Sequence, residues 1–383
     1  MRKGHVIVLL LSLPAFLAAQ CSSSCVLGEY GTAQGASGKS QYLVCMPQPT
    51  SCYKGDVILF AHGYVAQGSP ADAWLRQLAL PDGTTLPGLV NSLGFGFAAS
   101  SFSKNGLAIL QGIQDTKALT NVISGLGIPV HKYFVSGASE GGLVAAKSVE
   151  SDPSYGGGLA VCGPIGSFRR QINYFDDVRV LFDYFFPSVL TTGTAGESAI
   201  SIPPALIANW ATVYEPAVRK AVNSNFFATL QLISTAKIPI GLNFGNAADA
   251  ITGTLWYNVF ATNDAKATLG GNPYDNISRV YSGSFNDARL NTMVARFAAD
   301  PAALINLAGY ETTGLLADPL VTLHTTADPI VPFWQETLYA SKAQAAGSSS
   351  QLIHIPVLTY GHCNVNGTEA EAALLLLLLK AGL

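Results

Sequence analysis

The sequence predicts an α/β protein with a mostly parallel central sheet that is flanked by helices on both faces. Two observations carry this prediction: short runs that are apolar throughout, each followed by Gly, Ser, His or Asp, and helix-length stretches between them. Continuous apolar runs are typical of strands buried on both faces, as in parallel sheets. The chain has 383 residues, 49% of them hydrophobic, which is enough apolar material for a large core.

The elements follow from these runs in chain order. We expect strands at 57–61, 95–101, 133–136, 159–162, 320–324 and 352–357. We expect helices at 86–93, 107–124, 143–148, 205–214, 223–236 and 368–380. The last helix carries six consecutive leucines, but this run is far too short to span a membrane, so a buried terminal helix is the better interpretation.

One interval interrupts the alternation of strands and helices. Residues 167–314 hold helix-like segments and many aromatic side chains, so we interpret them as a cap inserted into a core formed by 20–166 and 315–383. The alternative is that they form a helical half of the core itself. The aromatic residues concerned are Tyr174, Phe175, Phe182, Tyr184, Phe185, Phe186, Trp210, Phe226, Phe227 and Trp256.

The N-terminus has the pattern of a signal peptide. Arg2 and Lys3 precede an apolar run over 6–17, and the small residues Ala18 and Ala19 follow it, which predicts a signal peptide over 1–19. The run is shorter than a spanning helix needs, so we expect a secreted protein, extracellular or periplasmic, with no stable membrane anchor after cleavage. The formal net charge of −3 offers no basic surface for nucleic acid.

Six cysteines fit an oxidising compartment, where an even number suggests disulfides. Four of them lie close to the mature N-terminus, and the sequence leaves their mutual pairing open: Cys21, Cys25, Cys45 and Cys52. Cys162 and Cys363 then remain for each other. The spacing contains no CxxC pair, which argues against a zinc site, and we expect neither a metal nor an organic cofactor.

The most specific motif is Gly137-Ala138-Ser139-Glu140-Gly141, a G-x-S-x-G sequence between an expected strand and an expected helix. A serine on such a strand-to-helix turn presents its hydroxyl at the C-terminal edge of the sheet. The flanking glycines permit a strained backbone, and the start of the helix favours developing negative charge. Ser139 is therefore the candidate nucleophile.

A nucleophilic serine needs a base and an acid that orients the base. In the α/β-hydrolase arrangement the chain order is nucleophile, acid, histidine. His362 follows the last strand and Asp328 follows the strand before it, so both are expected at the edge where Ser139 lies. His324 and His354 fall inside strands. Asp318 is a weaker rival to Asp328 because it precedes its strand.

Two backbone N–H groups are needed to bind the oxyanion of an acyl-transfer reaction. We expect one from Glu140, the residue after the nucleophile, and the other from Tyr64, in the loop that follows the strand at 57–61. Gly63 permits close approach of this loop. His62 is better explained as a brace for the loop than as the catalytic base.

The predicted topology also brings two cysteines to the site. Consecutive parallel strands usually lie side by side, so Cys162 should emerge one strand away from Ser139. Cys363 adjoins His362 and should arrive at the same place. A Cys162–Cys363 disulfide is therefore expected, and two buried free thiols are the alternative.

The motifs L-F-A-H-G-Y, G-A-S-E-G-G, T-A-D-P-I-V-P and Y-G-H-C resemble those of secreted α/β-hydrolase-fold esterases and lipases, over about 27–166 and 315–383. His362-Cys363 is similar to the His-Cys pair of tannase and feruloyl-esterase relatives. In those relatives a cysteine adjoins the serine, whereas Ala138 and Glu140 do so here. The resemblance implies the superfamily and not a substrate.

Together these features predict a serine hydrolase that cleaves a small-molecule or polymeric carboxylic ester with an apolar or aromatic group, through an acyl-enzyme intermediate. The cap aromatics are expected to form an apolar wall over Ser139. Two alternatives stay open: a serine peptidase of the same fold, with Glu197 or Glu215 as acids for a substrate amine, and an inactive binding protein.

Overall fold

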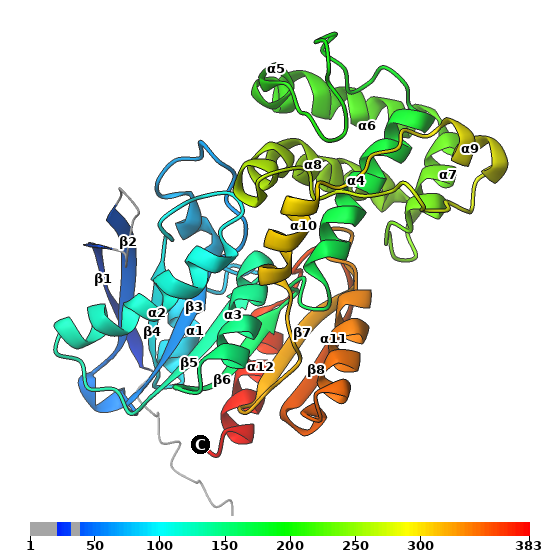
Figure 1. Ribbon diagram of the computed structural model, residues 1–383. Helices are drawn as coiled ribbons and strands as arrows, with labels where there is room; N and C mark the ends of the chain where they lie inside the picture. The colour runs from blue at the N-terminus through cyan, green and yellow to red at the C-terminus, as the bar shows by residue number, and fades with distance from the viewer. Residues whose placement is uncertain (1–20, 32–38) are drawn as a thin grey trace, which may run out of the picture.

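The computed structural model, which describes residues 21–31 and 39–383, contains an eight-stranded sheet flanked by helices (Figure 1). The strand order is β1-β2-β4-β3-β5-β6-β7-β8, and every neighbouring pair is parallel except β1–β2 and β2–β4. The predicted class is confirmed. The predicted signal peptide, 1–19, lies outside the described residues. The strands are β1 Ser22–Gly31, β2 Lys39–Gln48, β3 Asp56–Ala61, β4 Gly96–Ser100, β5 Lys132–Ala138, β6 Tyr155–Val161, β7 Leu320–Ala327 and β8 Leu352–Tyr360.

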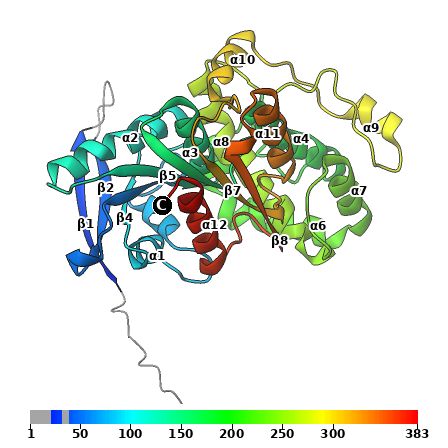
Figure 2. The same cartoon turned by 90° about the horizontal axis from the view of Figure 1, so that it is seen from below.

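Five helices cover the two faces of the sheet, α1 and α12 on one face and α2, α3 and α11 on the other (Figure 2). Alternating side chains of β3 supply both interfaces: Val57 and Leu59 pack toward α2 and α3, whereas Ile58 and Phe60 pack toward α1 and α12. Because both faces are covered, β3 is buried at every residue. The helices are α1 Leu86–Ser92, α2 Ile109–Gly125, α3 Glu140–Ser151, α11 Trp334–Ala345 and α12 Gly367–Lys380.

The first two strands were not expected from the sequence. Most of β1 is exposed, so it lacks the continuous apolar run that marks the central strands. Disulfides hold this edge instead. Cys25 and Cys45 face each other across the β1–β2 ladder and are bonded, and Cys21 is bonded to Cys52. These bonds give the pairing that the sequence left open.

Strand β6 begins at Tyr155, four residues before its expected start. Residues 156–158 are all glycine and therefore give no apolar signal. Glycine is required at 158, because a Cβ there would lie 2.7 Å from a methyl group of Val149 and 3.1 Å from the carbonyl oxygen of Val135. Close packing of α3 against β6 thus hides the start of this strand from sequence patterns.

A helical insertion, residues 168–310, lies between β6 and β7 and rises above the sheet in Figure 1. It has an apolar core of its own. The expected helix at 205–214 is two elements, α5 and a π-helical turn at Trp210–Tyr214, and the longest helix, α8, was not expected. Its α-helices are α4 Phe168–Phe185, α5 Pro204–Ala208, α6 Glu215–Ser224, α7 Phe226–Ala236, α8 Ala247–Leu269, α9 Asp287–Met293 and α10 Pro301–Leu307.

The leucine-rich helix α12 lies against the sheet. Leu374, Leu377 and Leu378 are buried, whereas Leu375 and Leu379 are exposed. One face of the helix therefore packs against the sheet and the other is open to solvent, although both faces carry leucine. A buried terminal helix was expected. Across residues 21–31 and 39–383, no helix combines the length and hydropathy that crossing a membrane requires.

Candidate active site

Ser139 lies in the turn between β5 and α3, with φ 56° and ψ −122°. This conformation is strained for any residue with a side chain and depends on its neighbours. A Cβ on Gly137 would lie 2.0 Å from the carbonyl oxygen of Gly141, and a Cβ on Gly141 would lie 2.0 Å from that of Ala61. The turn can therefore be this tight only with glycine at both positions. The Ser139 N–H donates to the carbonyl oxygen of Val161 at 2.8 Å and so ties the turn to β6.

His362 and Asp328 follow β8 and β7, so both lie at the edge of the sheet that carries Ser139. The Oγ of Ser139 and the Nε2 of His362 are 2.8 Å apart, and the Nδ1 of His362 is 2.7 Å from Oδ2 of Asp328. The other oxygen of Asp328 accepts the N–H groups of Ile330 and Val331 at 2.8 and 2.9 Å. Asp328 is fully buried, and these bonds fix its carboxylate toward the imidazole.

Three segments distant in sequence thus meet at one edge, in the chain order serine, aspartate, histidine, with the serine on a strand-to-helix turn of a mostly parallel sheet. The chain has the α/β-hydrolase fold. Asp318, the weaker rival to Asp328, lies two residues before β7 and so falls at the opposite end of that strand.

The remaining histidines near the site have other partners. His62 is buried, its Nδ1 lies 2.6 Å from the carbonyl oxygen of Gly63, and burial lowers its pKa. It therefore holds the loop after β3 as a neutral side chain. His324 in β7 and His354 in β8 both bond to the buried carboxylate of Glu336.

The loop after β3 approaches the nucleophile closely, because a Cβ on Gly63 would lie 3.1 Å from the Cβ of Ser139. The Gly63 N–H donates to Gln77 at 2.7 Å, and the Gln77 amide donates to the carbonyl oxygen of Tyr64 at 3.3 Å. Within the described ranges, the N–H groups of Tyr64 and Glu140 have no hydrogen-bond acceptor. Both predicted oxyanion donors are therefore available to a ligand.

The side chain of Glu140 points away from the nucleophile into the protein. Its Oε1 accepts the N–H of Ala108 at 2.8 Å, and the nearby carboxylate of Asp264 accepts the N–H of Leu107 at 2.5 Å. Burial raises the pKa of Glu140 to about 8, and the charge of Asp264 adds to that rise, whereas the Ala108 bond opposes it. Glu140 is therefore protonated at neutral pH and gives the site no negative charge.

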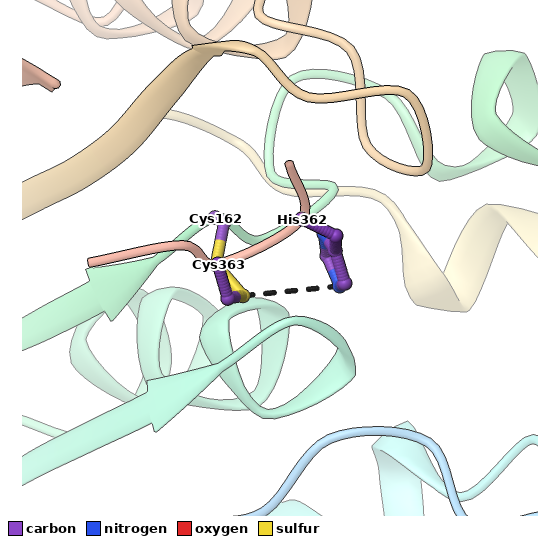
Figure 3. A group of neighbouring side chains, drawn as sticks. All are labelled: Cys162, His362 and Cys363. Atoms are coloured by element: carbon purple, nitrogen blue, oxygen red, sulfur yellow. Dashed lines mark hydrogen bonds between the residues drawn. A yellow bond between two sulfur atoms is a disulfide. The ribbon is translucent and has the colours of Figure 1, made fainter. Parts of the chain in front are cut away.

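A disulfide joins Cys162, directly after β6, to Cys363, beside His362 (Figure 3). The two Cα atoms are 5.5 Å apart, and the Sγ of Cys363 lies 3.8 Å from the Nε2 of His362. Among the described residues these three side chains form the one group of potential metal ligands close enough to share an ion. Both sulfur atoms are bonded to each other and cannot act as thiolates, so the group does not fit a metal while the disulfide is intact.

Two cavities meet at Ser139. The larger, about 350 Å³, extends between the sheet and helices α1 and α12. The smaller, about 80 Å³, lies under α4 and α8 of the helical insertion. Tyr64 and Tyr257 line both cavities together with Ser139. The larger cavity is lined mainly by apolar side chains, among them Ile58, Phe60, Leu86, Leu89, Leu159 and Leu374, and the smaller by Phe168, Ile172, Phe175 and Ile330.

Most of the aromatic residues named from the sequence do not form the expected wall. Of the ten named above, Phe175 lines the smaller cavity, but the other nine line neither cavity. Most of them pack within the core of the insertion, and Phe226 and Phe227 are exposed. The expectation is therefore wrong for nine of the ten. The insertion is rich in aromatic residues because most of them form its own hydrophobic core.

The sequence reasoning missed Tyr257. This residue of α8 stacks on Phe175, with ring centroids 5.0 Å apart, and so is held over the nucleophile. Burial raises the pKa of Tyr257, the charge of Asp328 acts in the same direction, and a hydrogen bond with the Ser139 side chain opposes the rise. Tyr257 thus presents a neutral hydroxyl at the nucleophile. No motif surrounds it in the sequence, so only the fold reveals it.

No protein-family model and no curated protein matches the sequence. Solved structures that are similar to the chain include a rice cell wall degrading esterase LipA from Xanthomonas oryzae, at 15% identity and a TM-score of 0.45 over 93% of this chain and 88% of that one. A Pyrococcus furiosus esterase, PF2001, is similar at 11% identity and a TM-score of 0.46, over 93% and 91%. A Pyrococcus horikoshii acylaminoacyl peptidase is similar at 9% identity and a TM-score of 0.46, over 94% and 41%. At these identities the similarity concerns the fold and does not extend to activity.

Proposed function

We propose that this chain is a secreted carboxylic ester hydrolase in which Ser139, His362 and Asp328 act as a catalytic triad. The observation that carries the proposal is the unbroken hydrogen-bond chain from the Ser139 hydroxyl through His362 to the buried Asp328 carboxylate. Such a chain activates a hydroxyl that is a weak nucleophile on its own.

The acylation step follows from these positions. Ser139 Oγ attacks the ester carbonyl carbon while Nε2 of His362 takes its proton, and Asp328 stabilises the resulting imidazolium. The carbonyl oxygen becomes an oxyanion that the N–H groups of Tyr64 and Glu140 bind. The C–O bond to the alcohol then breaks, His362 donates its proton to the leaving oxygen, and the acyl group stays on Ser139.

Deacylation uses the same groups with water as the nucleophile. His362 takes a proton from a water molecule, the resulting hydroxide attacks the acyl carbon, and the same two N–H groups bind the oxyanion. When the bond to Ser139 breaks, His362 returns the proton to Oγ. The carboxylic acid leaves, and the triad is restored.

The two cavities support an apolar or aromatic ester as the substrate. A volume of about 350 Å³ is in the range of small-molecule sites, and the lining of the larger cavity is mostly aliphatic or aromatic. Burying a substrate group there gains roughly 25 cal/mol per Å² of apolar surface. We propose that one side of the ester occupies this cavity, whether the ester is a small molecule or part of a polymer.

The peptidase alternative has weaker support. Glu197 and Glu215, which the sequence offered as acids for a substrate amine, line neither cavity. Glu197 bonds to threonines of its own loop and Glu215 to Arg219. Glu140, the acid beside the nucleophile, is protonated at neutral pH.

We also propose that the protein is secreted and that residues 167–314 act as a cap over the site. The three disulfides are consistent with secretion.

Active-site labelling combined with substrate series tests this function. A fluorophosphonate probe should label the protein at Ser139, and Ser139→Ala should abolish both labelling and hydrolysis of p-nitrophenyl esters. His362→Ala should lower kcat by about 10⁴- to 10⁶-fold. Aminoacyl-naphthylamides, run beside the esters, should be cleaved far more slowly. Full esterase activity in Ser139→Ala would refute the proposal, and faster cleavage of the amides would favour the peptidase.

A further inference from the structure

A second group of ionisable side chains, two of them buried and one half-buried, lies behind Asp328, and the mechanism above does not use it. His324 on β7, Glu336 on α11 and His354 on β8 are joined in a row. Nδ1 of His324 is 2.8 Å from Oε1 of Glu336, and Nδ1 of His354 is 2.5 Å from Oε2. His324 and Glu336 are both almost fully buried.

His324 faces acceptors on both sides of its ring. Besides the Glu336 carboxylate at Nδ1, its Nε2 lies 2.8 Å from the carbonyl oxygen of Val331. A carbonyl oxygen can only accept, and Glu336 already accepts the Thr322 hydroxyl at 2.6 Å, which favours its ionised form. With acceptors on both sides, each ring nitrogen must carry a proton, and the ring is a cation.

The cation also lies beside the candidate catalytic acid, since Nε2 of His324 is 3.7 Å from Oδ2 of Asp328, the oxygen that faces His362. We propose that His324 is a permanent buried imidazolium that holds the Asp328 carboxylate ionised and oriented, and is thus a positioning residue for the triad. The positioning role of His324 rests on the proposed function, whereas its positive charge does not depend on that function.

The electrostatics of the pair agree with the geometry. Burial alone would lower the pKa of His324, but the hydrogen bond and charge of Glu336, together with Asp328, raise it above its usual value. Burial would raise the pKa of Glu336, but its bonds to His324 and His354 lower it to about 2. Each partner therefore favours the charged form of the other.

The buried tyrosines that face this cluster are neutral near pH 7. Tyr174, Tyr257 and Tyr360 lie near Asp328 and Tyr339 lies near Glu336, and burial raises the pKa of each. The charges of Asp328, Glu336 and His324 sum to −1. Transfer of the Ser139 proton to His362 leaves the total charge unchanged, because the imidazolium forms together with the oxyanion. Without His324, the carboxylates of Asp328 and Glu336 would leave two negative charges in this buried region, which is costly.

Nitrogen NMR on the full chain with ¹⁵N-labelled histidine tests the charge directly. We expect both ring nitrogens of His324 to stay protonated at pH 8, whereas His62, buried against the Gly63 carbonyl oxygen, should be neutral and serves as the internal control. A His324 ring with one unprotonated nitrogen at pH 8 would overturn the proposal. This result does not depend on turnover, so it separates failure of this inference from failure of the proposed function.

The pH profile tests the link to the triad. The acidic limb of kcat/KM reports the ionisation of the essential groups of the free enzyme. In His324→Gln the loss of a positive charge beside Asp328 favours proton uptake at the triad, so the limb should move to higher pH by about one unit. In the double variant His324→Gln/Glu336→Gln, which removes both charges of the pair, the acidic limb should lie at a pH between that of His324→Gln and that of the wild type.

A residue that only packs the core would change the yield or kcat of active protein without moving this limb. An acidic limb at the wild-type pH in His324→Gln would therefore overturn the positioning role. If that variant does not fold, the NMR measurement on the unsubstituted chain decides the proposal.

Discussion

Removal of the Cys162–Cys363 disulfide is expected to damage both stability and catalysis. The perturbation is the double variant Cys162→Ser/Cys363→Ser, which leaves no unpaired thiol. Cys162 directly follows β6, next to the nucleophile turn, and Cys363 adjoins the proposed catalytic base, so the bond joins two of the segments that form the site. Its loss should therefore affect the fold as a whole and the position of His362 in particular.

The size of the stability effect follows from the loop that the bond closes. The bonded residues are 201 positions apart, and the chain-entropy model gives about 5 kcal/mol for a loop of that length, as an upper limit. With an unfolding entropy of about 2.1 cal/mol/K per residue, this corresponds to a fall in Tm of about 6 °C. The N-terminal disulfides close loops of 31 and 20 residues and should contribute about 4 and 3 kcal/mol.

The catalytic effect arises because His362 must stay within hydrogen-bond distance of Ser139. A displacement of about 1 Å can cost roughly 100-fold in rate, so we expect kcat to fall by about 10- to 100-fold. The matched control is Cys21→Ser/Cys52→Ser, which should lower Tm and leave kcat unchanged, since that bond lies at the distant sheet edge.

Calorimetry and p-nitrophenyl ester kinetics on both double variants give the result. Wild-type kcat in Cys162→Ser/Cys363→Ser would refute the view that this bond positions His362. Equal loss of kcat in the two variants would instead mean that activity follows overall stability, and it would refute the reasoning in the same way.

Three further predictions concern the site and its cavities. The folded protein keeps the Glu140 proton up to about pH 8, whereas the unfolded chain releases it near 4.5, so the stabilising contribution of this proton is full below about pH 4.5 and is lost by about pH 8. In chemical denaturation across pH, Glu140→Gln should remove this loss of stability, which is on the order of a few kcal/mol. The similar loss from Asp176, whose pKa is also raised to about 8, should remain. An unchanged pH dependence would contradict this. Tyr257→Phe should lower kcat about 10-fold at unchanged KM, if its hydroxyl donates to the transition state, and equal kinetics would exclude that role. Leu89→Trp should lower kcat/KM for long-chain p-nitrophenyl esters by roughly 10- to 200-fold and spare acetyl esters, and a uniform loss would show that the ester does not use the larger cavity.

The central sheet could be predicted because burial on both faces imposes uniformly apolar sequences. Strands β3, β4, β5 and β7 are largely buried, and each was expected within a few residues of its observed bounds. Strand β8 was also expected, although it lies at the sheet edge and has one buried residue. The antiparallel edge could not be predicted in the same way. β1 is exposed and is held by cross-strand pairing and disulfides, neither of which leaves a periodic apolar signal.

The candidate site was likewise predictable only in part. Ser139, Asp328 and His362 follow strand ends whose geometry is set by the sheet, so local motifs and chain order were sufficient to select them. Tyr257 and the larger cavity depend on how distant helices pack. The position of Tyr257 is set by α8 within the insertion, and that of the cavity by the spacing between the sheet and helices α1 and α12. Neither has a sequence pattern of its own.

The larger cavity also provides a way to search for the natural substrate without any assay of turnover. Its walls are side chains of the same apolar layer that holds α12 against the sheet. A compound bound there would stabilise the folded protein by about 2.7 kcal/mol at one hundred times its dissociation constant. The melting temperature would therefore rise by an amount that grows with the concentration of the compound. Thermal unfolding of the Ser139→Ala protein, measured with each ester of a library in turn, would rank candidate substrates by the stabilisation they confer.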